Sequence, residues 1–167
     1  MPPSFSLSIH ASRTTPHVPF VRRYLKRAHA ELAPPLAELS LAFVGDRVMC
    51  QLHERFMSLS GPTDVLTFPL ETDSRSRITS GELIICVPEA RRRAKALGVP
   101  LAHEMLLYAI HGMLHLSGFD DRTARQFSAM HREEDRLLKA IGIGAVFAAA
   151  APTVKAGRKL NASWQRP

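Results

Sequence analysis

The chain contains the stretch His111-Gly112-Met113-Leu114-His115-Leu116-Ser117-Gly118-Phe119-Asp120-Asp121, near the end of an apolar run that begins at Leu101. The run predicts a buried helix. Two histidines four residues apart on a helix share one face, so both imidazoles can reach one ion. Gly118 predicts the end of this helix, because glycine adopts the left-handed conformation without steric cost. The chain then turns back, and Asp120 or Asp121 can bring a carboxylate to the same site.

This combination of side chains predicts a metal site. Two imidazoles and one carboxylate leave a fourth position for water, as in catalytic zinc sites. A pair of histidines on a buried helix is by itself a weak signal, since such pairs often only complete a core. The helix stop and the two acidic residues that follow make it stronger. Local spacing does not choose between Asp120 and Asp121.

Three motifs together resemble the YbeY family of rRNA-maturation endoribonucleases. The stretch from His111 to Asp121 is similar to that family's H-G-x-L-H-L-x-G-Y-D-H. Gly61 to Pro69 resembles its P-T-D-V-L-S-F-P, and Gly81 to Ile85 resembles its G-D-I-x-I strand. The motifs occur in the family's order and span about Leu52 to Asp121.

The resemblance implies a ligand set and a metal. The family's final D-H pair aligns with Asp120 and Asp121, so Asp121 stands in the place of its third metal-binding histidine. His111, His115 and Asp121 are then the ligands, with one zinc ion per chain. Because a carboxylate is a harder ligand than imidazole, other divalent metals become more acceptable. Asp120 would orient a histidine or hold the turn.

A second departure from the family concerns an arginine. The family has N-x-x-Y-R before the T-D-V block, and its arginine is thought to matter for RNA cleavage. The matching residues here are His53-Glu54-Arg55-Phe56-Met57, so Met57 stands where arginine is expected. This departure bears on the cleavage mechanism rather than on the fold.

No catalytic residue can be assigned from the motif. Metalloproteases of the H-E-x-x-H type carry their general base directly after the first histidine, whereas this chain has Gly112 there. That argues against a peptide hydrolase. Three possibilities remain for the nucleophile: a metal-bound hydroxide that acts unaided, a nucleophile activated by Asp120 or Glu82 as the base, or a group of the RNA.

The resemblance implies a single-strand-specific, metal-dependent endoribonuclease of the cytoplasm that acts in rRNA maturation and ribosome quality control. Its partner would be ribosomal RNA or the small ribosomal subunit. The alternative is a ribosome-associated, RNA-binding assembly factor with a mainly structural metal, which Met57 favours. The net charge of +7 and the pI of about 10.1 permit an RNA partner. No apolar stretch approaches membrane-spanning length, and the two cysteines fall in expected buried elements, which indicates a reducing compartment.

The pattern of apolar residues predicts an α+β (mixed α/β) fold. We expect a single domain with a small mixed four-stranded sheet, about five flanking helices and a metal site at a helix end. The expected strands are Ser4–Ile9, Leu39–Val44, Thr63–Leu70 and Glu82–Val87, and 71–80 is expected to be a mobile loop. Residues 1–144 would form the metal-dependent RNase-like domain, and 145–167 an Ala-rich, then basic, disordered tail.

Overall fold

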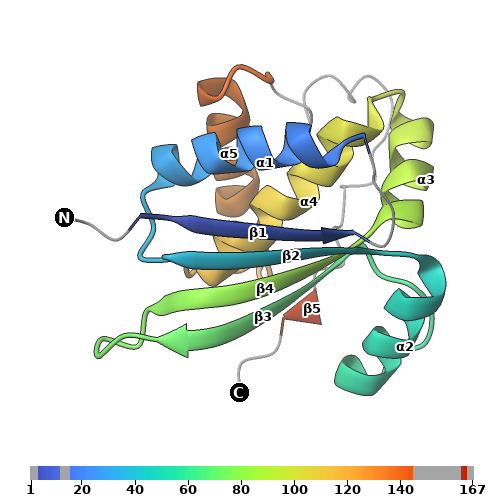
Figure 1. The fold of residues 1–167 in the computed structure, drawn as a ribbon, viewed down its shortest axis with the longest axis horizontal. Helices are drawn as coiled ribbons and strands as arrows, with labels where there is room; N and C mark the ends of the chain where they lie inside the picture. Colours follow the sequence, from blue (N-terminus) through green and yellow to red (C-terminus); the bar gives the residue numbers. More distant parts are fainter. Residues whose placement is uncertain (1–3, 12–15, 145–162, 165–167) are drawn as a thin grey trace.

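A mixed sheet lies at the centre of the fold, with the strand order β1-β2-β4-β3-β5 (Figure 1). The structure is a computed structural model that describes residues 4–11, 16–144 and 163–164. The strands are β1 (Ser6–Ala11), β2 (Glu38–Val44), β3 (Val65–Thr72), β4 (Ile78–Cys86) and the two-residue β5 (Ser163–Trp164). β1, β2 and β4 are parallel, whereas β3 runs antiparallel to β4. The four long strands and the mixed pairing confirm the expected fold class.

Helices lie on both faces of the sheet. They are α1 (Val18–Leu32), α2 (Asp46–Met57), α3 (Val87–Leu97), α4 (Leu101–Leu116) and α5 (Ala124–Ala140). Figure 1 shows α1, α4 and α5 above the sheet and α2 below it. The larger core contains Leu83, Ile85 and most of α4, while Ile84 and Cys86 belong to a smaller cluster with Met49 of α2. Alternate residues of β4 therefore face α4 and α2.

The helix that carries both histidines packs directly on β4. A Cβ at Gly112 of α4 would lie 2.6 Å from a Leu83 methyl carbon, and a Cβ at Gly81 of β4 would lie 2.6 Å from a methyl carbon of Leu116. Because each glycine has no side chain, it leaves room for a leucine side chain of the other element. These reciprocal contacts fix the position and rotation of α4 on the sheet. The helix is also enclosed on all sides, since every residue from Glu104 to its end is buried. The expected stop is also present, with Gly118 at φ 99°.

The expected mobile loop at 71–80 is wrong. β3 continues to Thr72 and β4 begins at Ile78, so only a short turn joins them. Oδ1 of Asp73 accepts the backbone N–H groups of Arg75 and Arg77, each at 2.9 Å. Residues 71–80 lack apolar periodicity because they include exposed strand ends. The turn between these ends stabilises them.

The C-terminal prediction falls largely outside the described part of the chain. Of the expected tail at 145–167, the structure describes only Ser163–Trp164, which pairs in parallel with β3 at Leu66 and Thr67. Within the described ranges, no helix is both long and apolar enough to cross a membrane.

Candidate metal centre

The last turns of α4 hold His111 and His115 side by side. Their Nε2 atoms are 3.1 Å apart, and the ring planes meet at 86°. Both side chains are buried. His103, on the same row of the helix, lies two turns before His111, which separates them by about 11 Å; it stacks against Phe20 of α1 instead.

Asp121 completes a group of three potential ligands. Its Oδ2 atom is 3.8 Å from Nε2 of His111 and 3.8 Å from Nε2 of His115. Tetrahedral zinc bonds of 2.0–2.2 Å place ligand atoms about 3.3–3.6 Å apart. The three separations of 3.1, 3.8 and 3.8 Å therefore fit one ion after shifts of a few tenths of an ångström. The Asp121 side chain is 17% exposed, so solvent reaches the group from its side.

Asp120 is engaged in the turn rather than in this group. Its Oδ1 atom accepts the backbone N–H of Asp121 at 2.8 Å, and its Oδ2 atom accepts from Nε of Arg122 at 2.8 Å. The first bond holds the backbone that carries Asp121. The geometry thus separates two adjacent aspartates that spacing alone could not distinguish.

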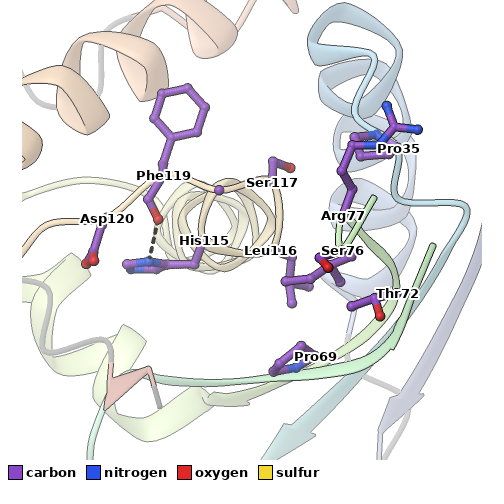
Figure 2. A pocket seen from close by; sticks show the side chains of 12 residues that line it. Pro35, Pro69, Thr72, Ser76, Arg77, His115, Leu116, Ser117, Phe119 and Asp120 are labelled. Carbon is purple, nitrogen blue, oxygen red and sulfur yellow. Dashed lines mark hydrogen bonds between the residues drawn. The ribbon is translucent and has the colours of Figure 1, made fainter. Parts of the chain in front are cut away.

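Hydrogen bonds at Nδ1 orient both imidazoles. Nδ1 of His115 lies 3.1 Å from the carbonyl oxygen of Phe119 (Figure 2), which can only accept, so Nδ1 carries the proton. Nδ1 of His111 lies 2.5 Å from Oε1 of Glu134 on α5. The other oxygen of Glu134 is 2.7 Å from Nδ1 of His131. With both Nδ1 atoms directed at protein oxygens, both Nε2 atoms face Asp121, and this arrangement is typical of metal-binding histidines.

The charges of the group are coupled. Burial opposes a charge on His111, but the hydrogen bond and negative charge of Glu134, with the charges of Asp64 and Asp121, outweigh burial and raise its pKa. Burial and the neighbouring His111 charge lower the pKa of His115 to about 4. Because a metal ion binds the deprotonated form of an imidazole nitrogen, a divalent ion at the two Nε2 atoms would compete with protons for them.

Glu134 is a site residue that the sequence motifs did not reveal. The Nδ1 partners of the two histidines are Glu134 and the Phe119 carbonyl. A signal for Glu134 existed, since it falls within the apolar stripe of α5. The buried positions of that stripe are Met130, Glu134, Leu137 and Leu138. A carboxylate within such a stripe needs a buried partner.

Two other sequence expectations are resolved by the packing. Leu83 and Gly81 face α4, so the alternation of a strand places Glu82 on the α2 side, and this excludes it as a base at the histidines. Met57, in the position where the family has arginine, is the last residue of α2 and packs against the small apolar cluster that contains Met49. Asp120 remains in the turn described above. The general base therefore stays unassigned.

A cavity of about 460 Å³ opens next to the group (Figure 2). His115 and Asp120 line one end of it. Thr72 at the end of β3, with Ser76 and Arg77 of the turn that follows, lines the other end. The site therefore continues from the candidate ligands along the end of α4 towards the hairpin.

Comparison with known proteins finds a family match and several relatives. The family model described as "Endoribonuclease YbeY" matches residues 11–142. The Endoribonuclease YbeY of Rhodococcus opacus is 38% identical over 113 residues, which cover 62% of this chain and 63% of that protein. The protein of the same name from Mycobacterium tuberculosis is 39% identical over 114 residues, covering 63% of this chain and 64% of its own length. Each match thus spans less than two thirds of the relative's length.

The fold also has a counterpart among solved structures. The solution structure of TM1509 from Thermotoga maritima superposes with a TM-score of 0.56, at 21% identity, covering 80% of this chain and 89% of that one. At this identity the likeness establishes the fold alone.

Proposed function

Because the chain belongs to the YbeY endoribonuclease family, we propose that it is a metal-dependent endoribonuclease that cleaves single-stranded RNA. The observation that carries the proposal is the group of His111, His115 and Asp121, whose ligand atoms all lie within 4.8 Å of one another. Zinc is the first choice of metal, and the carboxylate makes other divalent ions acceptable.

The chain's own residues prepare the group for this chemistry. Glu134 and the Phe119 carbonyl hold the two rings so that their Nε2 atoms converge, and burial keeps competing water from them. A zinc ion, when bound, supplies a water with a pKa near 7 and stabilises charge that develops on a phosphoryl oxygen. Asp121 lowers the net charge of the site by one unit relative to an imidazole. Substrate would approach from the side of Asp121, which is partly exposed.

We place this activity in rRNA maturation and ribosome quality control, with ribosomal RNA or the small ribosomal subunit as partner and the cytoplasm as location. Two observations support an RNA partner: the family match and the net charge of +7. A basic protein lowers the free energy of approach to a polyanion and favours fast association.

Cleavage assays test the proposal. The purified, zinc-loaded chain should cut a single-stranded oligoribonucleotide and leave the same strand largely intact in a duplex. A chelator should abolish the cut, and added zinc should restore it. The matched control is the double variant His111→Ala, His115→Ala, purified in parallel to exclude a contaminating nuclease. Equal cleavage by the double variant, or cleavage that resists chelation, would overturn the proposal.

The alternative function is an RNA-binding assembly factor with a mainly structural metal. Met57 favours it, because the apolar side chain at the end of α2 has no charge or hydrogen-bond donor to offer a phosphate. Under this alternative, chelation would lower the melting temperature, and RNA binding would occur without any cleavage. The two functions are therefore separated by measuring cleavage and thermal stability on the same metal-stripped sample.

A further inference from the structure

The cavity beside the candidate metal centre has two chemically different parts. Apolar side chains form one part: Pro35, Pro69, Ile78 and Leu116. The other part is polar and comes from the β3–β4 hairpin, with Thr72, Ser76 and Arg77. Figure 2 shows Arg77 and Thr72 on one side of Leu116, and His115 and Asp120 on the other. A ligand in this cavity would thus lie between the hairpin and the metal ligands.

Arg77 is held in place by its own turn. Nε and Nη2 donate to Oδ2 of Asp73 at 2.8 and 2.7 Å. The backbones of the two residues are also bonded, since Asp73 N–H donates to the Arg77 carbonyl at 2.9 Å. The ion pair occupies one edge of the guanidinium and leaves the Nη1 edge available to a ligand. An arginine oriented in this way loses less side-chain entropy when it binds.

We propose that this cavity holds one unpaired nucleotide of the RNA strand, next to the bond that is cut. Its base packs on the wall formed by Pro69 and Leu116, and Arg77 donates to it from Nη1. The proposal rests on the endoribonuclease activity proposed above and adds the place where the strand is selected.

Three observations support a nucleotide as the occupant. The volume of about 460 Å³ is within the range of about 300–1,000 Å³ for small-molecule sites. The apolar wall and the donor edge match a base, which has a flat apolar face and polar edges. His115 also lines the cavity, so a nucleotide inside it would place an adjacent phosphodiester near the ligand group.

The same geometry gives a physical reason for single-strand preference. A base within a duplex is stacked and paired, and it must leave the helix before it can enter a pocket, at a cost of about a few kcal/mol. An unpaired base enters without that cost. The preference for single-stranded over duplex RNA would then come from the cavity rather than from the metal centre.

Two variants of the full-length, zinc-loaded protein test the proposal, each with a matched control. Arg77→Ala removes the donor, whereas Arg75→Ala removes the same charge from the same turn at a side chain that does not line the cavity. Thr72→Trp fills the cavity from an exposed strand position, whereas Glu71→Trp places the same side chain on the neighbouring position outside it. All four positions lie outside the ligand group, so zinc content and melting temperature should match the wild type.

Binding is measured by fluorescence anisotropy with a 2′-O-methyl single-stranded oligonucleotide, checked on a gel for cleavage after each titration. Arg77→Ala and Thr72→Trp should each raise the Kd about 10-fold, the loss expected for a charged hydrogen bond or an occluded base. The two control variants should stay within about twofold. The KM for a cleavable strand should rise in parallel.

The outcomes separate this inference from the proposed function. If the wild type cleaves RNA but either folded cavity variant binds like its control, the nucleotide site is wrong and the nuclease proposal stands. If the wild type does not cleave, the nuclease proposal fails, and a loss of binding confined to the two cavity variants still supports the nucleotide site.

Discussion

Glu134 on α5 bonds to His111 on α4, with Oε1 at 2.5 Å from Nδ1, and the carboxylate is fully buried. Its second oxygen bonds to His131, one turn earlier on α5. Burial raises the pKa of a carboxyl group, yet the hydrogen bonds from both imidazoles outweigh burial and lower the pKa of Glu134. The carboxylate therefore remains ionised inside the protein, where it orients a candidate metal ligand.

Replacing Glu134 should weaken metal binding without removing a ligand. Glu134→Gln keeps the shape of the side chain but loses the charge that holds His111, so metal affinity should fall about 10- to 100-fold. Competition with a chromophoric chelator measures the change. The control is Glu133→Gln, whose side chain pairs with Arg136 on the surface, 3.0 Å from its Nε. Equal affinities for Glu134→Gln and the wild type would show that Glu134 does not act on the metal.

The adjacent aspartates should differ in their effect on metal content. Asp121→Asn should strip the metal, because Asp121 would supply the third ligand atom. Asp120→Asn should retain most of it, since its role is the 2.8 Å bond to the turn backbone. Asp121→His should be tolerated, because it restores the ligand set that the resemblance implies. Elemental analysis per chain measures all three variants, and a stripped Asp120→Asn with an intact Asp121→Asn would reverse the assignment.

The packing of α4 on β4 predicts a stability effect at Gly112. A Cβ at this position would approach Leu83 to 2.6 Å in a fully buried contact, so Gly112→Ala should cost about 1–3 kcal/mol of unfolding free energy. Gly45→Ser also adds a Cβ, but there nothing lies within 4 Å and serine is a favoured helix cap. Denaturant unfolding of the two variants should show a loss only for Gly112→Ala.

His29 should make stability depend on pH away from the metal centre. It stacks on Phe5 with ring centroids 3.5 Å apart and bonds to the Leu36 carbonyl at 2.6 Å. Burial lowers its pKa, so below the ordinary value of 6.5 the unfolded chain binds more protons than the folded one. Stability attributable to His29 is therefore complete above that value and is lost as pH falls towards the lowered pKa.

The measurement is the melting temperature between neutral and mildly acidic pH. The wild type should lose more than His29→Gln, which cannot gain a proton at this position. Because other histidines titrate equally in both proteins, the difference between the two curves isolates His29. Parallel curves would contradict the assignment.

Much of the candidate site was predictable because it is local in sequence. His111, His115 and the stop at Gly118 follow from helical spacing and backbone preference, and the structure brings them together as expected. The choice of Asp121 over Asp120 came only from register with a family. Its physical reason, the bond from Asp120 to the turn backbone, is visible only in three dimensions.

The remaining partners depend on tertiary packing. Glu134 lies 23 positions after His111, and no local pattern in the sequence predicts which side of α5 packs against α4. The hairpin at Asp73 was misjudged for a related reason, because exposed strand ends carry no apolar alternation. A turn stabilised by one aspartate is difficult to predict from composition, because its polar residues resemble those of any loop.

The three candidate ligands differ in how freely evolution or design can exchange them. His111 and His115 belong to a helix whose close contact with β4, through Gly112 and Leu83, leaves no room for a change of register. Asp121 sits on a partly exposed turn outside that contact. The hardness and charge of the centre can therefore be retuned by a single replacement at position 121, while the scaffold that positions the other two ligands stays unaltered.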